Sequence, residues 1–501
     1  MLDLNPIATR AAACGGLTRA CLLGVGMLTA ALALPDPVGA EIRAKDRVAL
    51  SLPDEKWTGD LDGMIERRKI RVLVAWNKTT FFIDKGTPRG VAYDALTAFE
   101  NDLNKKLKTK HLRVHLVFIP MTRQDMFQAL REGLGDIAAG NLTITKERDA
   151  IVDFTVPLLR DVREIVVTGP ASPAIATVDD LSGKDILVRK SSSYYESLVE
   201  LNARFKREGK PQIRLAPAPE NLEDEDLLEM LNAGLIRIMI VDDHKAEFWA
   251  KVFPKIVLHP DVAVRTGGAI GWAFRENSPQ LKAELDAFAE RTVGRSLGAE
   301  VLRRYLKDTK YVKNATGDAE RRKFEQIVEI FRKYGEQYRV DYVLAAAQGY
   351  QESRLDQKAR NPSGAVGVMQ VLPTTGKELK VGDITELDPN IHAGVKYIRF
   401  MIDQYYENEP MTEEDKVLFA FAAYNAGPGR VRQLRRLAKE RGLDENVWFN
   451  NVERVAAEKI GRETVTYVSN IFKYYVAYKL AMEEKAERDR ARSELKPAPT
   501  Q

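Results

Sequence analysis

The chain has 501 residues, of which 45% are hydrophobic and 30% charged, and its formal net charge is +4. This length is enough for about two to four domains with their own hydrophobic cores, and the composition is typical of globular proteins. The small basic excess is spread among many acidic residues, so it argues against a nucleic acid as partner.

Residues 1–40 have the pattern of a secretory signal peptide. Arg10 and Arg19 precede an apolar run that Pro35 ends, and residues 38–40 (Val-Gly-Ala) form a small-residue cleavage site. The run is short for a membrane-spanning helix, so we predict cleavage rather than an uncleaved anchor.

Both cysteines, Cys14 and Cys21, lie in this segment, and neither stands at the end of the apolar run, where a lipid-modified cysteine would be. The predicted mature chain therefore has no disulfide and no thiolate chemistry. No later segment is long and apolar enough to span a membrane, so any membrane attachment is expected to be peripheral.

Residues 41–60 form a polar extension, and a regular pattern begins after them. Strand-like runs over residues 71–76, 112–119 and 136–140 alternate with helical patterns over residues 90–103 and 125–130. Strands that alternate with helices predict an α/β domain with a largely parallel sheet.

A second α/β lobe is predicted after Pro157. It has segments over residues 180–188 and 234–242, the second of which brings Asp242 to a strand end, and the serines at 191–193 lie at a helix start, where hydroxyls and free amides favour an anion. Residues 267–274 are predicted to return as a strand into the first lobe.

The block Asn141–Arg148 (NLTITKER), followed by VDFTVP at residues 152–157, resembles the bacterial solute-binding proteins for amino acids and related polar solutes. The resemblance runs from about Asp60 to Arg295. It implies two α/β lobes joined by crossover strands, with a ligand in the cleft between them.

The same resemblance implies the ligand contacts. Arg148 would pair with a ligand carboxylate through its planar fork, and the hydroxyl of Thr143 would donate to the same group. Ser192 would bind through its helix start, and Asp242 would receive an amino group. The alternatives are that Arg148 is a solvated arginine, that Ser192 only caps a helix and that Asp242 is only a turn residue. The basic Arg189 departs from the family pattern, so the identity of the ligand stays open.

Residues 301–322 are predicted to be a linker, and a mostly helical domain follows over residues 323–483. Within it an apolar run after Asp341, a suitable N-cap, predicts a helix that ends near Glu352. The helix dipole and partial burial at that end would both raise the pKa of the Glu352 carboxyl, as a general acid requires.

Four motifs in this half resemble the lytic transglycosylases with the goose-type lysozyme-like fold. They are Glu352-Ser353, GVMQ at residues 367–370, AYNAG at 423–427 and ETVTYV at 463–468. The resemblance implies that Glu352 protonates the bond between N-acetylmuramic acid and N-acetylglucosamine. Its carboxylate would then act as base on the muramyl 6-hydroxyl, which gives a 1,6-anhydro sugar.

The other motif residues are candidates for holding the glycan strand. Gln370 offers amide hydrogen bonds, Met369 an apolar wall, and Tyr467 a hydrogen bond to Glu352. The alternatives are core packing for Met369 and Tyr467 and a turn for Asn425. The substrate-binding candidates are Ser353, Met369, Gln370, Tyr424, Asn425 and Tyr467.

No cofactor or metal is expected. His392 is the only histidine of the rear half, and a lone histidine is more often structural than a ligand. Glu463 is interpreted as structural, capping a helix or pairing with Arg462 or another cation. The charges alternate after Tyr478, and residues 484–501 are predicted to form a flexible tail, with the alternative that a solvated helix continues there before it frays through Pro497 and Pro499.

The sequence therefore predicts a multi-domain protein: a two-lobed α/β periplasmic solute-binding domain over residues 61–300, then a mostly α-helical lysozyme-like catalytic domain. The predicted partners are peptidoglycan, an amino acid or muropeptide in the cleft, and the outer membrane of a Gram-negative bacterium. Two alternatives stay open: a periplasmic amino-acid or muropeptide receptor whose rear half only binds cell wall, and a hydrolytic muramidase.

Overall fold

The computed structural model describes residues 55–84, 86–293 and 318–494. The predicted signal peptide, most of the polar extension, most of the linker and residues 495–501 lie outside these ranges. No helix in the described ranges is long and apolar enough to cross a membrane.

The first lobe begins with helix α1 and the buried strand β1, as the apolar run at residues 71–76 predicted. Apolar positions recur at helical spacing in the 16-residue helix that follows β3, so one face of it is buried against the sheet. Its elements are α1 (Leu61–Glu66), β1 (Lys69–Val74), β2 (Phe82–Asp84), β3 (Thr87–Arg89), α2 (Val91–Lys106), β4 (His115–Pro120), α3 (Arg123–Arg131), β5 (Ile137–Thr143), α4 (Lys146–Asp149) and β6 (Asp153–Phe154).

The second lobe lies between two long strands that belong to both lobes. Its buried apolar side chains form a cluster of their own, separate from the cluster around Val72 and Phe99 in the first lobe. Its elements are β7 (Leu159–Thr168), the 3-10 helix η2 (Val178–Leu181), β8 (Asp185–Val188), α5 (Ser193–Arg207), β9 (Arg214–Pro217), α6 (Asp224–Asn232), β10 (Ile238–Asp242), α7 (Asp243–Ala250) and β11 (Val257–Phe274). The helix after β11, α8 (Pro279–Val293), packs back onto the first lobe, where Leu281, Leu285 and Phe288 join the cluster around Val72 and Phe99.

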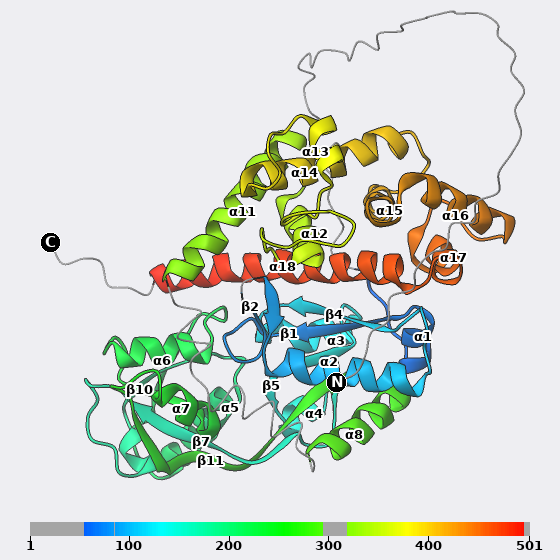
Figure 1. Ribbon diagram of the computed structural model, residues 1–501. Helices are drawn as coiled ribbons and strands as arrows, with labels where there is room; N and C mark the ends of the chain where they lie inside the picture. Colours follow the sequence, from blue (N-terminus) through cyan, green and yellow to red (C-terminus); the bar gives the residue numbers. More distant parts are fainter. Residues whose placement is uncertain (1–54, 85, 294–317, 495–501) are drawn as a thin grey trace, which may run out of the picture. The chain divides into compact units, whose positions relative to one another are not determined.

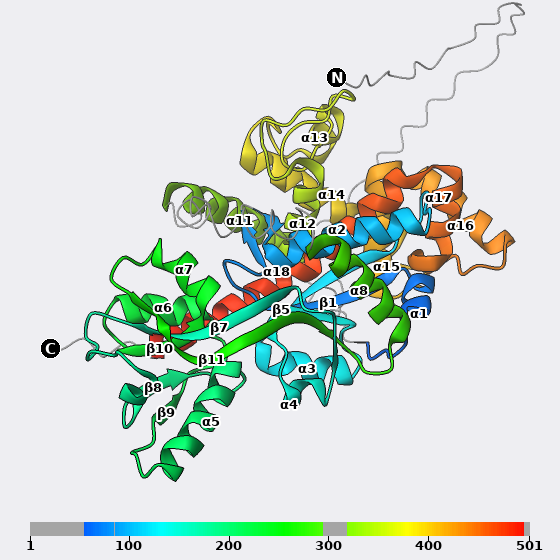
Figure 2. The same cartoon turned by 90° about the horizontal axis from the view of Figure 1, so that it is seen from below.

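The main sheet is mixed, which corrects the expectation of a largely parallel sheet. Its strand order is β10-β7-β11-β5-β1-β4, with β6 beside β11. Only β5, β1 and β4 are parallel, whereas β11 runs antiparallel to β5 and β7, and β7 antiparallel to β10. The long strands β7 and β11 run together through both lobes and are the crossover strands (Figure 2).

The rear half is helical, and no named strand occurs in its described residues 318–494 (Figure 1). Buried aliphatic and aromatic side chains fill its core, among them Leu344, Phe419 and Trp448. Its elements are α11 (Asp318–Tyr338), α12 (Tyr342–Ser353), α13 (Pro373–Leu379), α14 (Leu387–Tyr405), α15 (Glu413–Ala426), α16 (Pro428–Glu440), the π-helical turn η3 (Trp448–Val452), α17 (Glu453–Lys459) and α18 (Arg462–Glu494).

Helix α18 has 33 residues and continues past the predicted end of the catalytic domain. The segment from residue 484, expected to be a flexible tail, is helical as far as Glu494. Arg488 is only 7% exposed there and pairs with Glu225 and Asp226 of the second lobe at 2.9 and 2.5 Å. The charges that suggested a solvated tail are thus partly used in buried ion pairs.

Candidate active site and solute cleft

Helix α12 brings Glu352 to the end of a buried helix. Asp341 caps the helix by accepting a hydrogen bond from the Val343 amide at 2.9 Å, and every side chain from residue 343 to 350 is buried. The helix ends where Arg354 adopts a left-handed conformation (φ 60°). Glu352 therefore stands in the last turn, as predicted, where the helix leaves the core.

The pKa of the Glu352 carboxyl is raised to about 7, because the effect of burial is larger than that of the hydrogen bond from Tyr467, which lowers the pKa. The Tyr467 hydroxyl donates to Glu352 Oε1 at 2.5 Å and accepts from Gln348 Nε2 at 3.0 Å. Because Gln348 supplies the donor to the phenol oxygen, the phenol proton points to the carboxyl group. A carboxyl group held in this way is protonated near neutral pH and has one fixed orientation.

The turn at residues 367–370 packs against the end of α12. The Ser353 hydroxyl donates to the Val368 carbonyl at 2.8 Å, and the side chain of Asn390 accepts from the Met369 amide at 2.8 Å. Gln370, with φ 46°, donates through Nε2 to the Gly367 carbonyl at 2.8 Å. The polar groups of Ser353 and Gln370, expected to contact substrate, are bonded to this turn and hold its shape.

Met369 is fully buried, so its expected role as an apolar wall for a sugar is wrong. Its side chain packs against Gly349 and Gly394, where a Cβ atom would come within 3.0 Å and 2.5 Å of it. The alternative of core packing holds, because the side chain fills the space between two helices. The Met369 carbonyl oxygen accepts a hydrogen bond from the Tyr424 hydroxyl at 2.8 Å.

We expect Gly367→Ala to unfold this turn. The backbone at Gly367 has φ 78°, and a Cβ would lie 2.4–2.7 Å from the Asn390 amide, so strain and steric overlap together should cost about 3 kcal/mol or more. Thermal unfolding and activity would be measured beside Gly364→Ala, which has φ 89° with no atom within 4 Å of the Cβ. Equal losses in the two variants would contradict a specific role for the contact with Asn390.

Glu352 opens into a cavity of about 690 Å³. Asn425 and Tyr467 also line it, and the Asn425 side chain is oriented by the Thr464 hydroxyl, which donates to its Oδ1 at 2.6 Å. Part of the wall comes from the solute-binding half. The lining residues are Glu100, Arg113, His115, Gln351, Glu352, Asn361, Asn425, Arg462, Glu463, Thr466, Tyr467 and Asn470.

The cavity carries two arginines without a carboxylate partner among the described residues. The Arg113 guanidinium donates to Asn101 Oδ1 at 2.8 Å, and Arg462 makes no ion pair with its neighbour Glu463, a pairing that the sequence had suggested. In contrast, Lys473 beside the cavity pairs with Glu100 at 3.3 Å. The cavity therefore holds two guanidiniums that no carboxylate of the described residues pairs with, beside the carboxyl groups of Glu352 and Glu463.

The solute cleft uses its predicted residues differently from the family pattern. Arg148 donates from Nε to Glu196 at 3.0 Å, and from its terminal nitrogens to the Thr143 and Ser191 carbonyls at 3.1 and 3.0 Å. Ser192 is the N-cap of α5, since its Oγ accepts from the Tyr195 amide, which agrees with the helix-cap alternative. Arg148 is thus fully engaged by the chain itself.

Asp242 ends strand β10 as predicted and is 1% exposed. Its Oδ2 accepts from Asn141 at 2.9 Å and pairs with Lys245 at 3.0 Å, whereas its Oδ1 is buried without a hydrogen-bond partner. An unpaired buried carboxylate oxygen is costly, so this atom is a candidate acceptor for a ligand donor.

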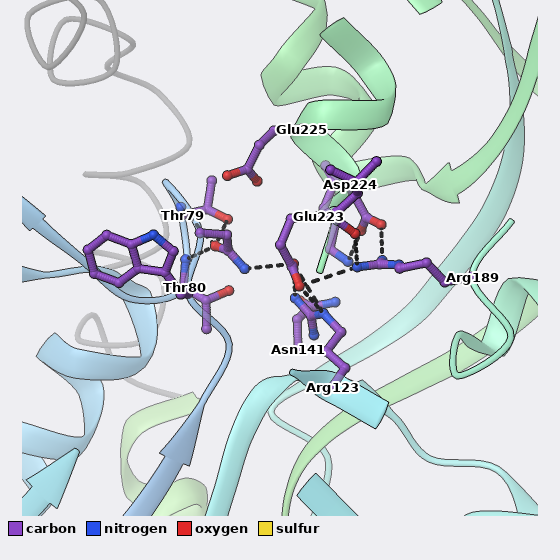
Figure 3. Close-up of polar contacts among 12 residues, drawn as sticks. Thr79, Thr80, Arg123, Asn141, Arg189, Glu223, Asp224 and Glu225 are labelled. Atoms are coloured by element: carbon purple, nitrogen blue, oxygen red, sulfur yellow. Dashed lines mark hydrogen bonds and ion pairs between the residues drawn. The ribbon is translucent and has the colours of Figure 1, made fainter. Parts of the chain in front are cut away.

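The sequence analysis missed a cluster of ion pairs in the same cleft (Figure 3). Arg123 and Arg189 both bind Glu223, and Arg189 also binds Asp224. Burial opposes the ionisation of Glu223, but the two guanidiniums outweigh it and lower its pKa to about 2. Two features of the sequence could have indicated this cluster: the basic Arg189, which departs from the pattern of the solute-binding family, and the four consecutive acidic residues at 223–226.

Asn390 and Gln348 were also not predicted, because neither is a member of one of the four motifs. His392 is structural: its ring stacks on Tyr334 at 4.1 Å and its Nε2 hydrogen-bonds the Tyr338 hydroxyl at 2.7 Å. Within the described ranges no three His, Cys, Asp or Glu side chains converge in a way that could hold a metal ion.

Comparison with known proteins agrees with both halves. Residues 70–307 match the bacterial extracellular solute-binding proteins, family 3, and residues 329–447 match the transglycosylase SLT domain. The solved structure of an ancestral arginine-binding protein bound to arginine is 21% identical, with a TM-score of 0.39, over 47% of this chain and 97% of that chain.

Two relatives are similar along most of the chain, and both are named membrane-bound lytic murein transglycosylase F. The protein from Desulfosudis oleivorans is 28% identical over 431 residues, which cover 81% of this chain and 89% of the relative. The protein from Pseudomonas fluorescens is 26% identical over 438 residues, covering 83% and 85%.

The fold, the helix-end glutamate and the family matches define a transglycosylase enzyme with an N-terminal solute-binding domain. Both resemblances predicted from the sequence are confirmed. The chain thus matches both domain families and is similar over most of its length to proteins named membrane-bound lytic murein transglycosylase F.

Proposed function

We propose that the chain is a peptidoglycan lytic transglycosylase, which cleaves the β-1,4 bond between N-acetylmuramic acid and N-acetylglucosamine without water. The observation that carries the proposal is Glu352, with its pKa raised to about 7 by burial and its orientation set by Tyr467, in a cavity of about 690 Å³. A protonated carboxyl group in a cavity of this size suits proton transfer to a glycosidic oxygen.

The chemistry needs only one carboxyl group. Glu352 gives its proton to the glycosidic oxygen, and the N-acetylglucosamine side leaves as an alcohol. The Glu352 carboxylate then accepts the proton of the muramyl 6-hydroxyl, whose oxygen closes onto the anomeric carbon. This forms a 1,6-anhydro ring and returns Glu352 to its protonated form, so no water is consumed.

A hydrolytic muramidase would need a second carboxylate as base or nucleophile. Glu463 lines the same cavity and is the candidate for that role. Glu100 also lines it but pairs with Lys473 at 3.3 Å and His115, so it is engaged as part of the domain contact. Asn425 and Tyr424 would hold the glycan and support the charge that develops on the sugar ring.

The charge of the cavity favours peptidoglycan over a neutral glycan. Peptidoglycan carries peptide stems with free carboxylates, and Arg113 and Arg462 offer guanidiniums that the described carboxylates do not neutralise. Because Arg113 belongs to the solute-binding domain, this domain would contribute to substrate binding as well as regulation.

The relatives' name and the predicted signal peptide support a place in the Gram-negative cell envelope. We propose the periplasm, with peripheral attachment to the outer membrane. The solute-binding domain would regulate cleavage through α18, which carries Tyr467 beside Glu352 and Arg488 beside α6. Such coupling requires that a ligand binds two states of the domain differently.

Digestion of purified sacculi, followed by mass spectrometry, tests the proposed function. We expect muropeptides that end in 1,6-anhydro-N-acetylmuramic acid and none with a new reducing end. Products heavier by one water molecule would identify a hydrolase and point to Glu463. Binding of solutes without any cleavage would instead support the receptor alternative.

A further inference from the structure

Glu223 reaches across the cleft from the acidic segment 223–226, and Glu225 of the same segment accepts a hydrogen bond from the Lys78 amide of the first lobe at 2.8 Å. Glu223 precedes helix α6 in the second lobe and is 6% exposed. Its carboxylate accepts hydrogen bonds from Arg123 and Asn77 of the first lobe and from Arg189 of its own lobe (Figure 3). Glu223 therefore joins the two lobes in the way that a ligand in the cleft would.

The donors around Glu223 satisfy a carboxylate completely. Oε1 accepts from Arg123 Nε at 3.1 Å and from Arg189 at 3.2 Å, and Oε2 accepts from Arg123 at 2.8 Å and from Asn77 at 2.9 Å. Two donors for each oxygen match the acceptor capacity of a carboxylate, and one guanidinium binds it in the bidentate manner.

We propose that Arg123, Arg189 and Asn77 form a binding site for the carboxylate of a solute, and that Glu223 occupies this site while the solute is absent. The solute competes with Glu223, which leaves the site when the solute carboxylate enters.

The charges of the cleft support this exchange. Arg123, Arg189 and Lys245 balance the carboxylates of Glu223, Asp224 and Asp242 one for one. Removal of Glu223 leaves one positive charge buried, and a buried unpaired charge is strongly unfavourable, so an anion must replace it.

A second observation comes from Asp242, which lies in the same network through Lys245. Its Oδ1 is buried and has no hydrogen-bond partner among the residues that the structure describes. A solute that carries a carboxylate for the arginines and an N–H donor for Asp242 would satisfy both groups. This describes an amino acid or a short peptide with a free carboxylate.

Arg148 is the alternative binding site for a solute carboxylate, because the carboxylate of Glu196 accepts a hydrogen bond from it as Glu223 does from Arg123. However, Glu196 presents only Oε1 to Arg148, at 3.0 Å, and two backbone carbonyls hold the rest of the guanidinium. A solute that displaced Glu196 would gain one contact from Arg148, whereas one that displaced Glu223 would gain four.

Acetate rescue of the full-length chain tests the proposal. Glu223→Ala removes the internal carboxylate and leaves space for acetate, so saturating acetate should raise its Tm by roughly 3 °C or more. The Tm of the wild type should not respond, and neither should that of Glu196→Ala. Acetamide, which has the shape of acetate without its charge, and chloride at equal ionic strength are the control solutes.

The proposal fails if acetate does not stabilise Glu223→Ala, or if Glu196→Ala responds while Glu223→Ala does not, since Arg148 would then be the site. Glu223→Gln serves where the alanine variant does not fold, because it keeps the side-chain volume. Its amide can leave the arginines, so acetate should raise its Tm by a smaller, saturable amount, and no response would likewise overturn the proposal.

Discussion

Glu352→Gln should reduce the release of 1,6-anhydromuropeptides from sacculi by about 10³-fold or more. The same carboxyl group is proposed as acid for bond cleavage and as base for ring closure, so the amide loses both steps. The amide keeps the shape of the side chain and can still accept a hydrogen bond from Tyr467, which lies 2.5 Å from Oε1. Rates would be measured by mass spectrometry of the digest over time.

Glu463→Gln is the matched control, because Glu463 lines the same cavity. It should keep most of the activity if one carboxylate suffices. A Glu352→Gln enzyme that still releases anhydro products near the wild-type rate would refute the assignment. Loss of activity in Glu463→Gln as well would favour the two-carboxylate mechanism of a hydrolase.

The free energy of unfolding, measured as a function of pH, shows whether Glu352→Gln is folded. It also tests whether Glu352 is buried. The pKa of Glu352 is raised by burial to about 7, so the fold favours the protonated form. Its contribution is complete below the unfolded pKa of about 4.3 and is lost as the pH rises through about 7. Glu352→Gln should therefore match the wild type near pH 4 and exceed it at pH 8, by roughly 3–4 kcal/mol at most.

The features that sequence predicted best are local ones. The apolar run at 71–76 became β1 at Lys69–Val74, and the apolar run after Asp341 became α12, because burial of one face requires a pattern that a short window contains. The contact of Tyr467 with Glu352 was predicted from motif resemblance and is present at 2.5 Å.

The features that it missed depend on partners far along the chain. Met369 looked available to a sugar, but it is buried because Gly349 and Gly394 leave room for it. Arg148 looked free to bind a ligand, but Glu196 lies 48 residues away and takes its Nε. Arg488 and Arg490 both adjoin Asp489 in the sequence, yet only Arg488 is buried. Pairings of this kind leave no local pattern.

Arg488→Ala should detach the end of α18 from the second lobe. Arg488 pairs with Glu225 at 2.9 Å and with Asp226 at 2.5 Å, and all three side chains are less than 10% exposed. Removal of the cation leaves buried Glu225 without its ion pair and Asp226 with only Arg492 at 3.4 Å, for which the expected cost is about 3–5 kcal/mol. The loss would be measured by calorimetric unfolding and by protease cleavage between residues 479 and 494.

Arg490→Ala is the matched control, because it removes the same side chain from an exposed position two residues away. It should leave unfolding and protease resistance unchanged. If Arg488→Ala behaved like Arg490→Ala, the end of α18 would not be anchored.

If α18 also transmits the state of the cleft, Arg488→Ala should make the cleavage rate independent of acetate in the Glu223→Ala background. Only Asp224 separates Glu223 from the pair Glu225–Asp226, so a movement of Glu223 reaches the partners of Arg488 through two peptide bonds.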